Sequence, residues 1–398
     1  MYNTTDQDAV RIYAMSHELS QSERLFLDLM SPPIADIVPV AAAVIVTTAI
    51  MAVSNRFNRP ESPPPPYAVS ERAPFTNPGR TITSAPFDDS RRSMLKRIAE
   101  QTLTAIREGS YPYKGVDQDL RDAVKEAKMK TVYYSPNSST KEWASTTFNH
   151  TRSSPTHISI LHISTLDAAR LLENVYRNNP SERGKTGILN FASATKPGGG
   201  FKNGADAQEE SIARSSTLYP ALETEEAQRF YRLHKRESAE NAIAFYSHAM
   251  IYSPNIVIFR DDNGVLTYPF PVDVLSCAAV NAGEVRKELN GPINSGLEVG
   301  IEKEMSERMG RILYLFERHC VRNIILGTFG TGVFRNSVTI VARIWAHLLL
   351  VPEARFKDSF DRIFFAITGE ETFAEFQSAF EAWGQPRAIG LTSRRMYT

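Results

Sequence analysis

The sequence predicts an α/β domain in which helices cover both faces of a mixed or parallel sheet, preceded by a non-globular N-terminal extension. Strand-like apolar runs alternate with helical periodicity over residues 91–385. Two glycine-rich segments each follow such a run. The chain has 398 residues, of which 42% are hydrophobic, enough for a sizeable core. Its net charge is zero, so we expect no direct DNA binding.

Apolar residues at helical spacing predict the helices, beginning with Leu95, Ile98 and Leu103 in the first. The predicted helices span Arg91–Arg107, Asp117–Ala127, Thr165–Arg177, Gln208–Arg236 with a break near Pro220, Glu302–Cys320, Asn336–Leu350 and Glu371–Ala382. The predicted strands span Thr131–Tyr134, His157–Ile163, Ile188–Ala192, Ile256–Arg260, Val274–Val280, Asn323–Leu326 and Arg362–Ile367. Ligands of such sheets bind beyond the carboxyl ends of the strands.

The N-terminal region differs in composition from the rest. Residues 1–36 are mildly acidic and show no strong core pattern, so we expect them to be disordered. Residues 37–53 carry no charge over seventeen positions, close to the shortest length that spans a bilayer. Either this segment anchors the chain in a membrane, or it docks on a surface or stays disordered. If it spans, Arg56 and Arg59 place the following domain in the cytosol.

Residues 54–90 read as a linker, because the run Pro63–Pro66 favours an extended polyproline II conformation. Pro64 to Tyr67 also resembles the Pro-Pro-x-Tyr ligand of WW domains. A stiff linker without a partner is the alternative. Residues 386–398 form a C-terminal tail, and Cys277 and Cys320 are expected to be reduced core residues. The domain is thus expected in the cytosol or nucleus.

The segment with the strongest chemical signal is residues 186–219. A buried-looking strand is followed by Gly198, Gly199 and Gly200, which allow close approach of the backbone to a ligand. Seven residues later, Gln208-Glu209-Glu210 opens a helix, so two carboxylates lie near a ligand above the glycines. An ordinary acidic first turn is the alternative.

A second loop follows the strand Asn323–Leu326 and precedes a helix, the setting in which glycine-rich backbone holds phosphate. Its candidate ligand-binding residues are Gly330, Thr331, Gly332, Val333 and Phe334. A tight structural turn is the alternative for the loop, and a core aromatic for Phe334. No Gly-Lys-Ser/Thr follows, so it is not a P-loop. No His/Cys cluster has metal-ligand spacing, and we expect no metal or redox cofactor.

The pattern Gly-Gly-Gly, seven residues, Gln-Glu-Glu resembles the signature of the microbial-type poly(ADP-ribose) glycohydrolases, which have a macrodomain fold. Segments similar to later blocks of that family follow in the family's order. They are Ser247–Asp261, Asp273–Gly283 and Leu326–Asn336.

The resemblance implies hydrolysis of ribose–ribose bonds in poly(ADP-ribose), with Glu210 as general acid and Glu209 binding ribose hydroxyls. It implies that Gln208 orients this pair, that Asn190 binds the distal ribose, and that the Gly330–Phe334 loop holds the diphosphate. Alternatives are a macrodomain that binds ADP-ribose without cleaving it, and a hydrolase of mono-ADP-ribose or a related derivative. A third is an adaptor that uses the N-terminal segments.

Overall fold

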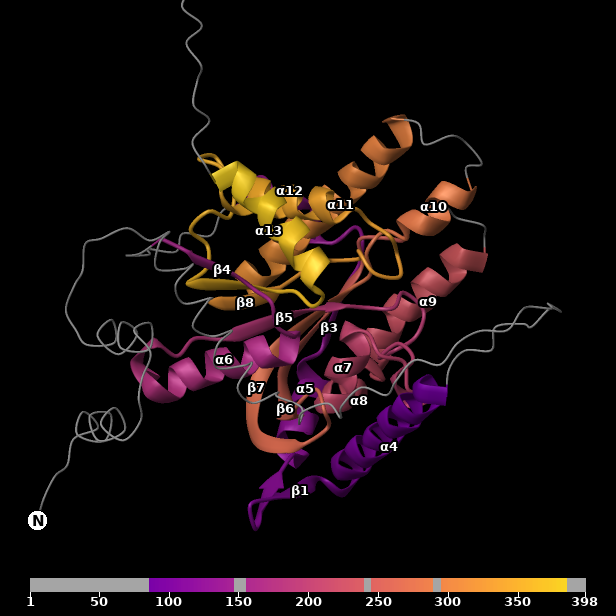
Figure 1. The fold of residues 1–398 in the computed structure, drawn as a ribbon, viewed down its shortest axis with the longest axis vertical. Coiled ribbons are helices and arrows are strands. Elements are labelled where there is room, and N and C mark those ends of the chain that lie inside the picture. Colours follow the sequence, from indigo (N-terminus) through magenta and orange to yellow (C-terminus); the bar gives the residue numbers. More distant parts are fainter. Residues whose placement is uncertain (1–85, 147–154, 240–244, 289–294, 385–398) are drawn as a thin grey trace, which may run out of the picture. The chain divides into compact units, whose positions relative to one another are not determined.

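The computed structural model describes residues 86–146, 155–239, 245–288 and 295–384. Within these ranges a seven-stranded sheet lies between two layers of helices (Figure 1). The strand β6 is antiparallel to both of its neighbours, and the remaining strands share one direction. The predicted α/β class with a mixed sheet is therefore confirmed.

Across the sheet, the strands follow an order that differs from their order in the chain. That order is β3 (Val132–Tyr134), β6 (Met250–Arg260), β7 (Leu266–Cys277), β5 (Thr186–Phe191), β8 (Asn323–Leu326), β9 (Arg362–Ala366) and β4 (His157–Leu161). The central position of β5 places the residues after it at the middle of the carboxyl edge of the sheet.

Helices cover both faces because successive strand residues point to opposite sides. Ile188 packs in one apolar layer and Leu189 in the other. The layer of Ile188 is formed by α5 (Arg121–Lys130), α6 (Thr165–Asn178), α7 (Gln208–Ser215), α8 (Leu218–Leu222) and α9 (Glu225–Ala239). The layer of Leu189 is formed by α10 (Ala282–Glu288), α11 (Ser295–Arg318), α12 (Val338–Leu349) and α13 (Glu370–Gly384).

The long helix α4 (Pro86–Glu108) packs outside the layer of Ile188, against α7. Its buried Ala99 meets Phe201 and Ala213 in a small apolar cluster. Phe201 belongs to a 3₁₀ turn, η3 (Phe201–Asn203), that directly follows the glycine triplet. Short 3₁₀ turns also occur at Ser139–Glu142 and Pro180–Glu182. Helix α4 thus packs against the turn that follows the glycine triplet.

One predicted helix begins too early. Residues 117–119 belong not to a helix but to β2 (Val116–Asp119), which pairs with β1 (Ser110–Tyr113), and α5 starts only at Arg121. Lys114 and Gly115 join the two strands with φ of 50° and 78°. Positive φ at both central residues gives the turn that matches strand twist. The Lys-Gly pair between Tyr113 and Val116 was the overlooked signal.

The helix predicted over Gln208–Arg236 is interrupted twice, before and after the short helix α8 that contains Pro220, and not at Pro220 itself. Pro220 is the third residue of α8, in the first turn, where a missing backbone N–H costs nothing. The chain leaves the helix at Ser216 and Thr217, and the Thr217 hydroxyl accepts a 2.9 Å hydrogen bond from Val257 N on β6. This connection fastens the end of α7 to the sheet.

Strand β7 is longer than the predicted Val274–Val280 and ends earlier, at Cys277. Its first half contains Pro269 and Pro271 and pairs with β6, whereas its pairing with β5 begins only at Asp273. Prolines are tolerated in this first half because, among the described strands, only β6 pairs with it. Its other edge needs no backbone N–H to donate to a neighbouring strand.

Helix α11 begins seven residues before the predicted Glu302, β6 six residues before the predicted Ile256, and α4 five residues before the predicted Arg91. Helix α10 was not predicted. The other predicted helices and strands are confirmed to within about three residues at either end.

The predicted N-terminal segments, residues 1–36, 37–53 and the linker up to residue 85, lie outside the described residues, as does the tail 386–398. Residues 86–90, predicted as the end of the linker, belong to α4 instead. None of the helices that the structure describes is long and apolar enough to cross a bilayer. Cys277 and Cys320 are both free thiols, as predicted. Cys277 is buried in the core, but the prediction of a core position was wrong for Cys320, which is exposed.

Candidate active site

The site forms where β5 and β8 part at the carboxyl edge of the sheet. Pairing between them stops at Ile188 and Ile325, while β5 continues along β7 as far as Phe191. The Gln208 amide fills the gap, accepting from Phe191 N at 2.9 Å and donating to Leu189 O at 2.7 Å. The side chain therefore replaces a strand partner and fixes the start of α7 on β5.

The predicted orienting role of Gln208 thus has a structural basis, because Glu209 and Glu210 follow it directly in α7. A third contact, 3.3 Å from Gln208 Nε2 to Thr165 Oγ1, ties the same amide to the start of α6. With both ends of the amide in use, Gln208 acts on the carboxylates through the backbone that it anchors.

The glycine triplet lies against the two carboxylates. Gly198 and Gly199 have φ of 67° and 59°, in the left-handed region that favours glycine. A Cβ on Gly199 would lie 2.2 Å from Glu210 Oε1 and 3.1 Å from Glu209 Oε2. Both carboxylates therefore approach one point of the backbone that only glycine leaves open.

Glu210 is held directly by the triplet. Its Oε1 accepts a 2.8 Å hydrogen bond from Gly200 N, and its side chain is half-buried. The carboxylate is therefore oriented by backbone while part of it stays accessible, as contact with a substrate requires. The motif predicted from the sequence is thus assembled as one unit.

Glu209 lies deeper, with only 3% of its surface exposed. Its Oε2 accepts from Ser193 N at 2.7 Å. Burial raises the pKa of Glu209 to about 8, and the charge of Glu210 adds to this, while the hydrogen bond from Ser193 opposes it. At neutral pH the buried carboxyl therefore keeps its proton.

Asn190 is also fully buried, beneath Glu209. Its Nδ2 lies 2.9 Å from Ser276 Oγ and 3.4 Å from Glu209 Oε1, and its Oδ1 has no hydrogen-bond partner within the described part of the chain. The structure thus joins Asn190 to the carboxylate pair. Its predicted contact with ribose stays a prediction.

The second predicted loop connects β8 to α12 and has an anchored base. Gly330 has a φ of 77°, and a Cβ there would lie 2.4 Å from the Cβ of Ala279. Asn336 Nδ2 donates to Gly330 O at 3.0 Å and to Val280 O at 2.7 Å. These contacts hold the loop against the segment that follows β7.

The tip of this loop is open. A Cβ on Gly332 would meet no atom within 4 Å, and Val333 is 84% exposed. Phe334 is half-buried, with its ring centroid 5.8 Å from that of Tyr246. Thr331 N donates to Thr328 O at 3.2 Å, so the open backbone of the loop lies at Gly332 and Val333, beside the ring of Phe334.

The two loops are neighbours, because they follow adjacent parallel strands. The ring of Phe191, the last residue of β5, lies 5.7 Å from the ring of Phe329, which follows β8. A Cβ on Gly327 would lie 3.1 Å from the Phe191 ring. The structure thus brings the glycine triplet, the carboxylate pair and the second loop to one place.

The sequence analysis missed the groups that support these loops. Arg308 is fully buried and donates to Ala278 O at 3.0 Å and to Phe245 O and Tyr246 O at 2.9 Å each. It thereby fixes the backbone of Tyr246, on which Phe334 packs. A single arginine on the apolar stripe of α11 was the available signal.

The described residues contain no cluster of histidine, cysteine, aspartate or glutamate suited to a metal ion. His248, which lies in one of the family-like segments, contacts Glu304 Oε2 at 3.0 Å. Burial and nearby arginines lower its pKa to about 3, so it is neutral at physiological pH.

An α/β fold with two adjacent carboxylates beneath a glycine-rich loop defines a candidate glycoside-hydrolysing site. The sequence model described as the microbial-type PARG catalytic domain matches residues 99–261. Among curated proteins, none matches the chain.

Solved structures of poly(ADP-ribose) glycohydrolases (PARG) are similar to this chain. The enzyme from Thermomonospora curvata is 32% identical, with a TM-score of 0.64, covering 73% of this chain and 100% of its own. The complex of that enzyme with the inhibitor ADP-HPD is 31% identical, with a TM-score of 0.61, and the match covers 73% of this chain and 99% of that structure. The enzyme from Deinococcus radiodurans in complex with ADP-ribose is 28% identical, with a TM-score of 0.54, and the match covers 66% of this chain and 98% of that structure. The chain therefore belongs to the microbial-type poly(ADP-ribose) glycohydrolase family.

Proposed function

We propose that this protein hydrolyses ribose–ribose O-glycosidic bonds in poly(ADP-ribose) and releases ADP-ribose. The observation that carries the proposal is the contact of Glu210 with Gly200 N, because it places a half-exposed carboxyl beside the backbone that a ribose would overlie. Family membership supports the substrate, since the relatives are poly(ADP-ribose) glycohydrolases.

In the proposed reaction, the Glu210 carboxyl protonates the leaving ribose oxygen as the anomeric C–O bond breaks through an oxocarbenium-like transition state. Water adds to the anomeric carbon, and its proton returns to the carboxylate. Glu209 Oε2 and Glu210 Oε1 lie within 3.1 Å and 2.2 Å of the point where a Gly199 Cβ would stand. Burial keeps a proton on Glu209, and in the proposed reaction this proton passes to Glu210 before the C–O bond breaks, so that Glu210 is the acid in that step.

Asn190 would hold Glu209 and the distal ribose. The Gly330–Phe334 loop would hold the diphosphate through its open backbone at Gly332 and Val333, with Phe334 beside the ribose. Backbone N–H groups ahead of a helix suit an anion. The Ser337 side chain accepts from Ile340 N and caps α12, so the helix begins directly after this loop.

The full chain, incubated with poly(ADP-ribose), is expected to release free ADP-ribose, measured by liquid chromatography. Parallel reactions contain a mono-ADP-ribosylated protein. Release from the modified protein alone would favour a mono-ADP-ribose hydrolase. Binding of ADP-ribose without release from either substrate would leave a binding module, and both results would contradict the proposal.

We also propose that Pro64 to Tyr67 binds a WW domain, on the grounds of its Pro-Pro-Pro-Tyr sequence. The wild-type chain should bind an immobilised WW domain, and Tyr67→Ala should abolish that binding, with Tyr268→Ala as a control. Equal binding by the wild type and Tyr67→Ala would contradict the proposal.

For residues 37–53 we propose membrane attachment, with the catalytic domain in the cytosol. The uncharged run and the arginines after it support this. Deletion of residues 37–53 should move the protein from the membrane fraction to the soluble fraction. Recovery of both forms in the soluble fraction would contradict the proposal.

A further inference from the structure

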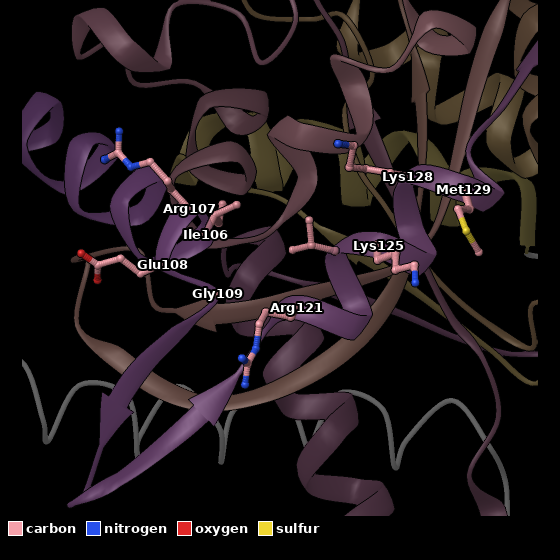
Figure 2. Close-up of a pocket in the computed structure, with 9 residues that line it drawn as sticks. Ile106, Arg107, Glu108, Gly109, Arg121, Lys125, Lys128 and Met129 are labelled. Atoms are coloured by element: carbon pink, nitrogen blue, oxygen red, sulfur yellow. The ribbon is translucent and has the colours of Figure 1, made fainter.

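A positively charged groove lies outside the site described above, between the end of α4 and helix α5. Its cavity of about 490 Å³ has Arg107, Arg121, Lys125 and Lys128 at its margin and Glu108 as its acidic residue. Figure 2 shows the charged side chains spread around a floor that includes Ile106 and Gly109. We name this cavity and its extension described next the α4–α5 groove.

The groove extends toward the active site. A second cavity of about 290 Å³ shares Ile106, Arg107 and Lys128 with the first and reaches Tyr219 and Glu223 on α8 and its end. The α4 residues that line the two cavities run from Leu103 to Glu108, about 7.5 Å at 1.5 Å per residue, and the groove continues past them to α5 and α8. The groove is therefore an elongated surface and not an isolated hollow.

Lys202 links the groove to the glycine triplet. It lies in η3, two residues after Gly200, whose N–H holds Glu210. Lys202 Nζ lies 2.5 Å from the Tyr219 hydroxyl and 3.9 Å from the centre of the Tyr219 ring, and Tyr219 lines the second cavity. A row of cations thus runs from the catalytic loop into the groove.

The charge of the groove is largely free to act on a ligand. Arg121 pairs with Asp119, but no ion pair joins Arg107, Lys125 or Lys128 to another described residue. Arg107 donates to Thr104 Oγ1 at 2.9 Å, an uncharged partner. The four cations of the two cavities face two acids, Glu108 and Glu223, in a chain of zero net charge. This local excess favours a polyanion.

We infer that the α4–α5 groove binds the part of the poly(ADP-ribose) chain that continues beyond the bond being cleaved. This inference rests on the proposed function. The leaving oxygen lies at Glu210, so the rest of the polymer must pass the backbone of Gly200 and Lys202. Each further unit brings a diphosphate that free lysine and arginine side chains can neutralise.

The test compares a long substrate with a short one in the full chain. Lys125→Gln/Lys128→Gln is measured on long poly(ADP-ribose) and on a dimer with one ribose–ribose bond. We expect KM for the polymer to rise roughly three- to tenfold at about 50 mM salt, with kcat unchanged, and the difference to shrink at higher salt. The dimer has only one unit beyond its bond, so its KM should change less than that of the polymer.

The matched control is Lys235→Gln/Lys303→Gln, which removes the same charge from exposed positions on α9 and α11. It should leave the polymer kinetics unchanged. An unchanged KM for the polymer in Lys125→Gln/Lys128→Gln, or an equal change with the dimer, would overturn the inference.

Binding of fluorescently labelled polymer separates this inference from the proposed function. If the wild type cleaves neither substrate, the proposed function fails, but weaker polymer binding by Lys125→Gln/Lys128→Gln would still support the groove. Unchanged polymer binding combined with weaker binding of a DNA oligonucleotide would assign the groove to nucleic acid and overturn the inference.

Discussion

Glu209 and Glu210 are neighbours in the chain but lie in different environments. Glu210 is half-buried against Gly200 N, whereas Glu209 is 3% exposed and bonded to Ser193 N. Burial, aided by the charge of Glu210, raises the pKa of Glu209 to about 8. Adjacent residues of the same type can therefore have separate tasks, one accessible to substrate and one fixed below it.

The raised pKa of Glu209 predicts a pH-dependent effect on stability. A folded pKa of about 8 exceeds the ordinary 4.5, so the wild type loses stability as pH rises from 4.5 to 8. Glu209→Gln removes this loss. Its free energy of unfolding should therefore rise relative to that of the wild type by up to about 1.4 kcal/mol per pH unit over that range. Urea denaturation at pH 5, 6.5 and 8 measures the difference.

Glu353→Gln, at an exposed position, serves as the control. Its free energy of unfolding should differ from that of the wild type by a similar amount at each pH. If the difference between Glu209→Gln and the wild type were also constant across pH 5 to 8, Glu209 would not be the protonated member of the pair.

Gly199→Ala tests the close approach of the backbone to the carboxylates. Its φ of 59° disfavours alanine, and the new Cβ would lie 2.2 Å from Glu210 Oε1. We expect a loss of about 1–2 kcal/mol from the backbone alone and displacement of the Glu210 carboxylate. Thermal unfolding and ADP-ribose release are measured together.

Gly300→Ala is the matched control, because a Cβ at this helical glycine meets nothing within 4 Å. It should keep activity and leave stability unchanged or raise it by about 0.5–1 kcal/mol. Full activity of Gly199→Ala would show that the position of Glu210 does not depend on the triplet.

At the scale of secondary-structure elements, α7 is joined to β5 by one amide. Gln208→Ala would leave Leu189 O and Phe191 N without their partner at the point where β8 has diverged. Each unsatisfied buried backbone group costs about 1–3 kcal/mol. We expect a loss of stability in that range, measured by urea denaturation, and a fall in kcat because α7 carries both carboxylates.

Gln377→Ala provides the comparison, since the Gln377 amide contacts Glu381 on the exposed face of α13. Its stability should stay within about 0.5 kcal/mol of the wild type. A similar small effect of Gln208→Ala would mean that packing of α7 and not its amide anchor fixes the helix.

At the scale of the whole molecule, the order of strands and helices followed from local patterns. The strand Asn323–Leu326 was predicted with its observed ends because a short apolar run lies between a helix and a glycine. The hairpin β1–β2 was missed although Lys114 and Gly115 mark its turn, because Tyr111 is buried by residues distant in the chain, among them Phe259 of β6, with ring centroids 4.9 Å apart. Such long-range contacts leave no mark on local periodicity.

The site residues and their proposed roles were predictable from the sequence, but the contacts that hold these residues in place were not. The motif placed Gln208, Glu209 and Glu210 beside the glycines, and the structure brings them together. The roles of Ser193, Arg308 and the Gln208 amide depend on where β5, β7 and β8 end relative to one another. That register is a property of the folded sheet, which one sequence does not specify.

The central claim, that Glu210 is the general acid, is tested most directly by Glu210→Gln beside Glu209→Gln in the full chain. ADP-ribose release from poly(ADP-ribose) is measured together with ADP-ribose binding by calorimetry. The account predicts that Glu210→Gln lowers release by about 100-fold or more and still binds ADP-ribose. Normal release by Glu210→Gln, with release lost in Glu209→Gln, would contradict it and make the buried, protonated Glu209 the acid.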